Sequence, residues 1–246
     1  MKILVCVSKV PDTTTKISFT DNDTKFNNSN VTWIMNPTDE WYALVRALEL
    51  KEAAGGTVTL INVGDAENDA IIRKGLAIGA DDAVRINGAE NDPYYIASQI
   101  ANYAKDKGYD IIFTGKETIN YNGYVIGGLV SELLDLSYVS MVNKLDVNGG
   151  VATAKREIEG AIETLEIKLP LVVSAQKGIA EARIPNMRGI MAARTKPLQV
   201  IEPVAADELV SVVKYELPAP KQAVKLFKVE EVEKLVEALH NEAKVI

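Results

Sequence analysis

The chain has 246 residues, 47% hydrophobic and 25% charged, which is typical of a folded protein with one large α/β domain plus an arm, or with two small domains. Its net charge of −7 argues against a nucleic-acid binder, because phosphate contacts need a basic surface. One cysteine and one histidine argue against a disulfide, a clustered metal site and a Ser-His-Asp triad. The apolar runs are far shorter than the roughly 20 residues of a membrane helix, so no membrane span is predicted and a cytoplasmic protein is expected.

The N-terminal part predicts a strand, a polar excursion and a helix. Residues 2–7 form an apolar run too short for a signal peptide, and they predict a buried strand. In the excursion, "KISF" and "VTWIM" are expected to pair across a turn-rich cluster. The helix is expected to be capped by Asn36, with Pro37 in its first position and Asp39 in its first turn, and to end at Gly55-Gly56.

Strands and helices then alternate along the chain. Strands are expected at residues 57–63, 82–86 and 110–113, and helices at 68–77, 95–105 and up to 134. This order predicts an α/β fold, a Rossmann-like doubly wound parallel sheet with helices on both faces. Ligands of such sheets bind at the carboxyl ends of the strands, near the topological switch. The first, second and fourth strands should therefore meet at a nucleotide site.

The segment "TGKETINYNGYVIGG", residues 114–128, lies between the fourth strand and the next helix. It matches neither G-x-x-x-x-G-K-[ST] nor G-x-G-x-x-G. Backbone N–H groups at the start of a helix can still bind an anion without any particular side chain. The alternative is a glycine turn that lets the helix pack on the sheet.

The pattern changes after residue 138. "VATAKRE" and "ETLEIKL" predict a hairpin with Leu165, Ile167 and Leu169 on one face, and residues 171–175 predict an apolar strand. Residues 176–200 read as a loop-rich basic segment. We expect an α/β domain over residues 1–205 and an arm over 206–246. The arm ends in a helix with an apolar stripe: Val229, Val232, Leu235, Val236 and Leu239.

Four segments carry a resemblance to a known family. They are "LVCVSKVPDTTTKI", "MNPTDEWYALVRALELKE", "GLAIGADDAVRI" and, most specific, "AKREIEGAIETLEIKLPLVVS" at residues 154–174. In the last, a basic residue, acidic residues and a Pro before an apolar strand keep the family's spacing, although Ala161 stands where relatives mostly carry glycine or an acid. Over essentially its full length, the chain resembles the β subunit of electron transfer flavoproteins.

This resemblance implies the adenine nucleotide α-hydrolase-like variant of the Rossmann fold, with the added hairpin and the C-terminal arm. It implies a non-catalytic electron-carrier subunit of a heterodimer, whose α subunit holds most of an FAD and collects electrons from acyl-CoA or other dehydrogenases. The β subunit itself buries an AMP, and in the electron-bifurcating branch a second FAD takes that place. The arm would contact the α subunit or fold on its own core, and we expect the α subunit.

The resemblance also assigns residues to the nucleotide. Two aspartates of the family loop are Asn120 and Asn122 here, and two polar residues are Val125 and Ile126, so the loop holds an adenine nucleotide or is a degenerate, empty site. Cys6 could instead be a small buried hydrophobe, and the residues at 36 and 39 could be helix caps. The assigned residues are Cys6, Asn36, Pro37, Thr38, Asp39, Val63, Gly115, Lys116, Glu117, Thr118, Ile119, Asn120, Tyr121, Asn122, Gly123, Tyr124, Val125 and Ile126.

Two further sites follow from the resemblance. Thr13, in "VPDTTTKI", would face the flavin across the subunit interface, or belong to an ordinary turn. "ARIPNMRGIMAAR" corresponds to the family's recognition loop, with Met187 as the docking anchor for the dehydrogenase. Arg183, Arg188 and Arg194 would steer it toward an acidic partner. The alternative is a solvated basic loop with Met187 packed inward.

Two other classes of protein share this type of fold. A stand-alone nucleotide-sensing module, like universal stress proteins, would carry a G-x-x-G phosphate pattern with a later Gly-Ser or Gly-Thr, which the chain lacks. An ATP-using amide or thiolation enzyme would need S-G-G-x-D-S after the first strand, where this chain has Ser8-Lys9-Val10-Pro11.

Overall fold

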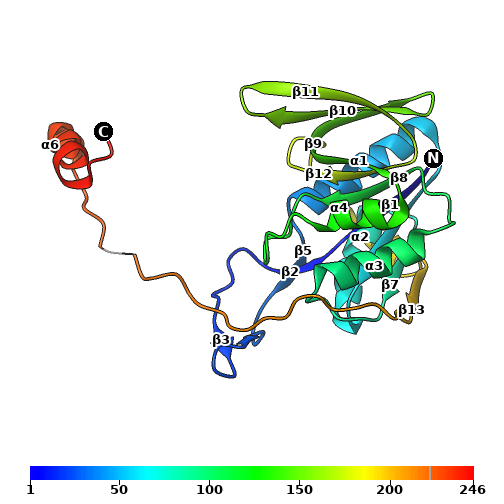
Figure 1. Ribbon diagram of the computed structural model, residues 1–246. Helices are drawn as coiled ribbons and strands as arrows, with labels where there is room; N and C mark the ends of the chain where they lie inside the picture. The colour runs from blue at the N-terminus through cyan, green and yellow to red at the C-terminus, as the bar shows by residue number, and fades with distance from the viewer. Residues whose placement is uncertain (222) are drawn as a thin grey trace.

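The computed structural model describes residues 1–221 and 223–246 (Figure 1). Within them, nine strands form one sheet in the order β11-β10-β9-β12-β8-β1-β6-β7-β13. From β9 to β13 in this order all neighbours are parallel, whereas β10 and β11 are antiparallel. The strands are β1 Lys2–Cys6, β6 Thr57–Val63, β7 Asp82–Ile86, β8 Ile111–Gly115, β9 Ser137–Asn148, β10 Val151–Ile158, β11 Ala161–Lys168, β12 Leu171–Ala175 and β13 Leu198–Ile201.

Helices cover both faces of this sheet. The four main ones are α1 Asp39–Ala54, α2 Asp69–Ile78, α3 Pro93–Ala104 and α4 Ile126–Leu134. Successive residues of β1 point to opposite faces, so Val5 packs in one buried cluster with Leu44 of α1, and Leu4 packs in the other with Ile100 of α3. The predicted Rossmann-like α/β fold is confirmed.

The start of α1 differs from the prediction. The helix begins at Asp39 and its N-cap residue is Thr38, whose side chain makes no capping hydrogen bond. Asn36 and Pro37 therefore precede the helix, and the predictions that Asn36 caps it and Pro37 opens it are wrong. Asp39 does lie in the first turn, and the helix ends before Gly55 as predicted. Asn36 is fully buried, and its side-chain amide makes hydrogen bonds to the backbone of Glu117 and Ile119 and makes none to the helix.

The pairing predicted for the polar excursion is also wrong. β3 (Phe19–Thr20) pairs with β4 (Lys25–Phe26) as a short hairpin. β5 (Trp33–Met35) pairs with β2 (Lys9–Pro11), the continuation of the first strand. Asp21, Asn22 and Asp23 all have positive φ and make a tight turn, which closes the β3–β4 hairpin before the chain reaches "VTWIM".

The hairpin of β10 and β11 is confirmed, with Leu165 and Ile167 turned toward the core. The prediction placed no strand at β9, which joins this hairpin to β12. β10 and β11 extend the sheet beyond its parallel part, at the top of Figure 1. Their outer edge strand is β11.

The segment 176–200 is not merely a loop. It holds α5 (Met187–Ala193), which packs beside α2, and the first residues of β13, which pairs with β7 at the other edge of the sheet. Arg73 of α2 donates to the carbonyl oxygens of Ala193 and Lys196. The loop-rich prediction is corrected at these two elements.

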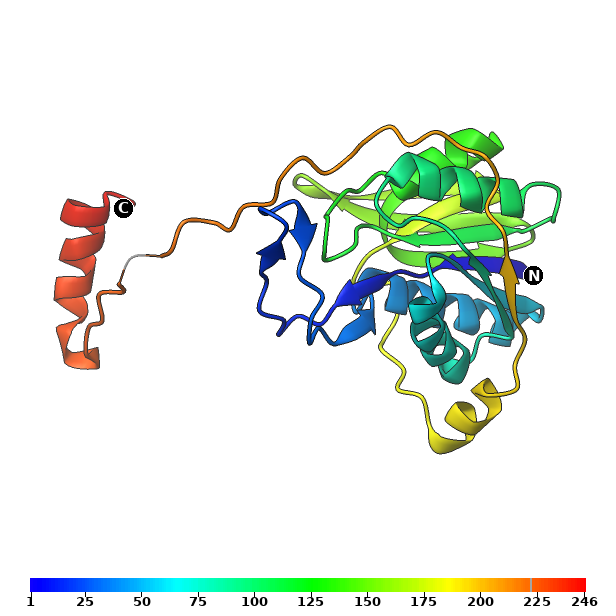
Figure 2. The same cartoon turned by 90° about the horizontal axis from the view of Figure 1, so that it is seen from below.

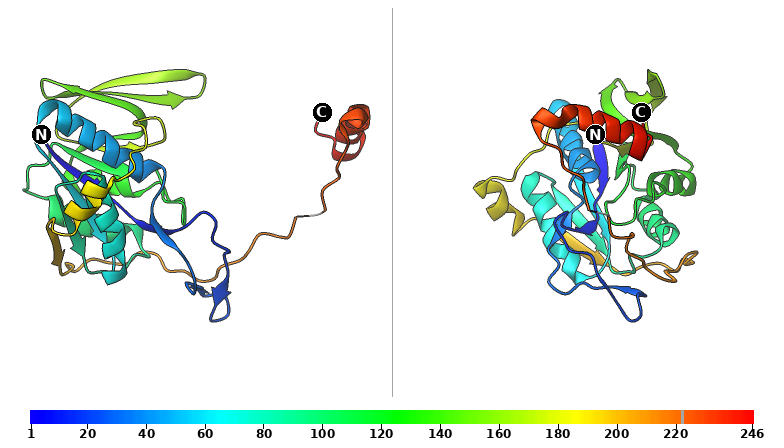
Figure 3. Two further views of the ribbon diagram at one scale, coloured as in Figure 1. Left: turned by 180° about the vertical axis from the view of Figure 1, so that it is seen from behind. Right: turned by 90° about the vertical axis from the view of Figure 1, so that its left-hand side faces the viewer.

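After β13 the chain returns across the molecule. It runs along the side of α3 toward the β3–β4 hairpin (Figure 2) and then leads to a C-terminal helical segment that stands away from the sheet (Figure 3). That segment consists of η2 Val229–Glu231, α6 Val232–Glu237 and the π-helical η3 Ala238–Ala243. Among the helices of the described residues, none has the length and apolarity to cross a membrane.

Candidate functional site

The predicted nucleotide residues gather where the direction of the strand order reverses. From β1 the chain goes to β6 and β7 on one side, and then returns to β8 on the other side of β1. Cys6 ends β1, Val63 ends β6 and Gly115 ends β8, so these adjacent strands present their carboxyl ends together. A crevice at this reversal is the usual ligand site of an open α/β sheet.

Asn36 ties the segment before α1 to the Gly-rich loop. Its Nδ2 donates to the carbonyl oxygen of Glu117 at 2.8 Å, and its Oδ1 accepts from the N–H of Ile119 at 3.3 Å. The N–H of Glu117 donates to Asp39 Oδ2 at 3.3 Å. The two segments that the sequence predicted separately thus form one structural unit.

The Glu117 side chain organises the inside of the loop. Its Oε2 accepts from Asn122 Nδ2 at 2.7 Å, and its Oε1 lies 3.1 Å from Lys116 Nζ. Burial tends to raise the pKa of Glu117, but hydrogen bonds from Asn122, Tyr124 and Lys116 outweigh it and hold the pKa below its ordinary range. The Lys116 ammonium also lies 5.5 Å from the centre of the Tyr124 ring.

Two buried acidic residues, Asp39 and Glu40, lie beneath the loop. The carboxylate of Glu40 accepts from the N–H of Ser8 at 2.6 Å and from its hydroxyl at 2.7 Å. Burial raises the pKa of Glu40 to about 8, so this group is largely neutral at pH 7. Burial also raises the pKa of Asp39, against the attraction of Lys116, and the pKa of the Cys6 thiol. Cys6 is therefore an unreactive thiol that packs in the core.

Several features of the loop fit an anionic ligand. The N-terminus of α4 has no side-chain cap, so the N–H groups of its first turn remain available. Within the described residues, Thr114 Oγ1 is buried under that turn without a hydrogen-bond partner. A Cβ on Gly127 would lie 2.8 Å from Thr114 Oγ1, and one on Gly115 would lie 2.9 Å from Glu40 Cγ. Both glycines are needed for this close approach.

The remaining loop residues lie toward solvent. Tyr121 is 51% exposed and Tyr124 is 53% exposed. The hydroxyl of Tyr121 lies 3.3 Å from that of Tyr215, which links the loop to the C-terminal arm. Other predicted residues that are exposed or half-buried are Pro37, Thr38, Thr118, Ile119, Asn120, Asn122, Gly123, Val125 and Ile126.

The sequence prediction missed Lys9. Its side chain is 8% exposed, and Nζ lies 3.3 Å from Glu67, 3.6 Å from Glu90 and 3.7 Å from Asp65. It also lies 4.9 Å from the centre of the Trp33 ring. One ammonium thus joins β2 to the loops after β6 and β7. The sequence signal for a buried lysine was its position, because Lys9 lies between the apolar strand at residues 2–7 and the apolar Val10.

Thr13 is exposed in the turn that follows β2. Asp12 shapes this turn, because its Oδ1 accepts from the N–H of Thr14 at 2.9 Å and from its hydroxyl at 2.6 Å. Lys9 positions the strand that precedes it. The side-chain contacts of Lys9 and Asp12 therefore hold in place the turn that carries Thr13.

The predicted docking segment projects from the molecule at α5. Met187 is 73% exposed, and Ile184 and Met191 beside it are also exposed, so Met187 does not pack inward. Arg188 and Arg194 are exposed as well. Arg183 differs, because its guanidinium forms a two-point ion pair with Glu52 at 2.6 and 2.9 Å.

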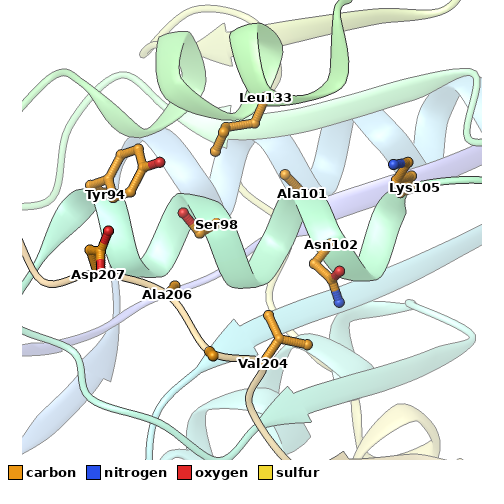
Figure 4. A pocket seen from close by; sticks show the side chains of 10 residues that line it. Tyr94, Ser98, Ala101, Asn102, Lys105, Leu133, Val204, Ala206 and Asp207 are labelled. Carbon is orange, nitrogen blue, oxygen red and sulfur yellow. The ribbon is translucent and has the colours of Figure 1, made fainter.

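Two surface hollows lie away from the predicted nucleotide residues. One, of 590 Å³, lies between α3, Leu133 of α4 and the chain that leaves β13 (Figure 4). Its polar lining includes Ser98, Asn102 and Lys105, and none of the predicted nucleotide residues contributes to it. The other lies between α2 and α5 and includes Arg183 and Arg188. Across residues 1–221 and 223–246, no three His, Cys, Asp or Glu side chains form a metal-binding group.

The chain is similar to known proteins of one family. Residues 23–206 match the model of the electron transfer flavoprotein domain. The chain is 36% identical to the electron transfer flavoprotein subunit beta of Bacillus subtilis, with 100% of both chains covered. It is 32% identical to the same subunit of Syntrophomonas wolfei, covering 100% of this chain and 98% of the relative. It is also 31% identical to the acryloyl-CoA reductase electron transfer subunit gamma of Anaerotignum propionicum, covering 82% of this chain and 78% of the relative.

Proposed function

Because the chain belongs to the electron transfer flavoprotein β-subunit family, we propose that it is the electron-carrier β subunit of an αβ flavoprotein, without a catalytic constellation of its own. The observation that carries this proposal is the joining of the Asn36 segment to the Gly-rich loop at the reversal of the strand order. This arrangement suits a bound nucleotide better than it suits covalent or acid–base chemistry.

An adenine nucleotide binds at this site. The uncapped first turn of α4 and the Lys116 ammonium would hold its phosphate, and the segment around Asn36 would form the opposite wall. Thr114 Oγ1 supports this assignment, because it is a buried oxygen beneath the turn that has no hydrogen-bond partner in residues 1–221 and 223–246. The nucleotide is AMP, and FAD in the same site is the alternative that the test below distinguishes.

The α subunit is the stable partner. It holds most of the FAD, which supplies the electron-carrying chemistry when bound, and Thr13 faces that flavin from the turn after β2. Residues 206–246 act as an arm that contacts the α subunit. Exposed apolar side chains on the terminal helix support this role: Val229, Val232 and Val236 are 90%, 57% and 50% exposed.

Dehydrogenases dock at α5, with Met187 as the anchor. The exposure of Met187 and the positive charges of Arg188 and Arg194 support this role, because an acidic partner would be attracted and then held by apolar contact. Arg183 stabilises the docking segment, because its ion pair with Glu52 fixes this segment to α1. The name of the Anaerotignum relative favours a partner that acts on an acyl-CoA.

Co-expression with its α partner tests the proposal. We expect a yellow 1:1 complex, and acid denaturation should release AMP, or additional FAD, in about equimolar amount to β chains. A colourless monomer would contradict the carrier function and favour a stand-alone nucleotide-sensing module. FAD alone at one per heterodimer, without AMP, would mean that the Gly-rich loop is empty.

A further inference from the structure

The Glu117 carboxylate is surrounded by groups that ordinarily bind phosphate. Lys116 offers an ammonium at 3.1 Å, and Asn122 offers an amide N–H at 2.7 Å. The same Lys116 ammonium lies 5.5 Å from the centre of the Tyr124 ring. The Glu117 side chain is only 16% exposed, so it is held within the loop and is not extended into water.

This carboxylate lies in the loop that leads into the uncapped start of α4. The N–H groups of that first turn are suited to an anion, and so is Thr114 Oγ1, which has no hydrogen-bond partner among the described residues. Lys116, the ammonium assigned above to the nucleotide's phosphate, is paired with Glu117, so a carboxylate of the protein itself holds a donor that an external anion would use. A phosphate could not share the Lys116 and Asn122 donors with Glu117, because like charges at such short range repel strongly.

The Glu117 side chain can leave without unfolding the loop. Its backbone is fixed independently, since its carbonyl oxygen accepts from Asn36 and its N–H donates to Asp39. The part of the loop that would have to move is the side chain, and its neighbours from Asn120 to Val125 are exposed. Rotation of one side chain would free both Lys116 and Asn122.

Resting on the proposed nucleotide function, we propose that the Glu117 carboxylate is a built-in competitor that occupies the place of the nucleotide's phosphate and is displaced when the nucleotide binds. The loop then keeps its shape without ligand. The affinity for the nucleotide is set by how much more strongly the Lys116 and Asn122 donors bind its phosphate than they bind the Glu117 carboxylate. A ligand that lacks a phosphate does not compete with Glu117.

Isothermal titration calorimetry of the full-length chain with AMP and with adenosine separates these cases. Glu117→Gln keeps the shape and the acceptor for Asn122 but removes the charge, so AMP should bind about tenfold more tightly, equivalent to roughly 1.4 kcal/mol. Adenosine should change less than about twofold. Lys116→Met should weaken AMP binding about tenfold, and should weaken adenosine binding less than about twofold because adenosine has no phosphate for the ammonium to hold. Asp146→Asn is the matched control, because it removes a carboxylate from an ion pair with Arg46 on another part of the sheet.

The affinities of the wild type and the variants for AMP and adenosine decide whether Glu117 is a competitor. If the wild-type chain binds AMP, and Glu117→Gln binds it equally or more weakly, the competitor role is wrong while the nucleotide site stands. Equal gains for AMP and adenosine would also overturn it. If neither the wild type nor Glu117→Gln binds AMP or adenosine, the nucleotide function fails together with this inference. Melting curves of the variants confirm that each is folded, and the adenosine measurement separates phosphate effects from general disturbance of the loop.

Discussion

The buried amide of Asn36 is hydrogen-bonded to the backbone of Glu117 and Ile119, in a loop that lies far along the chain. Its neighbour Thr38 holds the N-cap position of α1 but makes no capping hydrogen bond with its side chain. The residue that looks like a helix cap is therefore a clamp on the Gly-rich loop. These two positions can be separated experimentally.

Asn36→Ala should lower the free energy of unfolding by about 1–2 kcal/mol, because both of its loop partners lose a hydrogen bond. Thr38→Ala should change it by less than about 0.5 kcal/mol, since it removes no cap. Urea unfolding of both variants measures the difference, and proteolysis within residues 116–125 reports the loop directly. Equal effects of the two substitutions would show that Asn36 is not the clamp.

The buried carboxyl of Glu40 predicts a pH dependence of stability. Burial raises the pKa of Glu40 to about 8, so the folded state binds a proton that the unfolded state has released. Its stabilisation is fully present below the ordinary glutamate range and is lost as pH rises through 8, with a slope of at most about 1.4 kcal/mol per pH unit. Asp39 beside it contributes in the same direction, because burial raises its pKa as well.

Glu40→Gln isolates this contribution. A glutamine mimics the neutral carboxyl, since it can accept from the Ser8 N–H and donate to the Ser8 hydroxyl. The variant's stability, measured by denaturant unfolding between pH 5 and 9, should fall less steeply with pH than that of the wild type. Parallel curves would mean that Glu40 titrates as an ordinary exposed carboxyl.

Met187→Glu should slow electron transfer from the dehydrogenase partner to the assembled flavoprotein at least about tenfold in kcat/KM, as expected for a charged substitution at a docking anchor. Met187→Leu, which keeps an apolar side chain of similar size, should stay near the wild-type rate. The FAD content of both variants should equal that of the wild type, because α5 lies away from the Gly-rich loop. Unchanged kinetics for Met187→Glu would remove Met187 from the docking surface.

Asp92 fixes the root of the C-terminal arm. One carboxylate oxygen caps α3 by accepting from the N–H of Tyr95 at 2.7 Å, and the other accepts from the N–H groups of Leu209 and Val210 at 2.7 and 2.6 Å. Asp92→Ala should cost about 1–2 kcal/mol for the lost cap and speed trypsin cleavage at Lys214. Ser98→Ala on the same helix is the control, and equal cleavage rates would show that Asp92 does not hold the arm.

Much of the fold was predictable because its parallel strands are short apolar runs. Residues 57–63 and 171–175 follow this rule, and both of these strands, together with the strand at 82–86, were predicted with the bounds they have in the structure. β9 was not predictable in this way. Its buried residues Val139, Val142 and Leu145 recur every third position, because irregular pairing around Met141 and beside Lys155 disrupts the period of two.

The candidate site was predictable in its location and not in its internal contacts. The β-α order alone placed the loop at the carboxyl end of β8, as found. The bonds of Asn36 to the loop and of Lys9 to three acidic side chains join positions that are distant in sequence, and local patterns carry no record of them. Asn36 before Pro37 fits a cap motif equally well, so tertiary contact decided between two locally sound interpretations.

Gly115 and Glu40 restrict one another's evolution. A methyl group at 115 would press on the middle of the Glu40 side chain, which Ser8 holds at its far end and which therefore has little room to yield. A lineage that gained alanine at 115 would be expected to carry a shorter side chain at 40 as well, because the new methyl group would otherwise overlap Glu40. Comparing many descendants of this chain should reveal the two positions drifting as a pair.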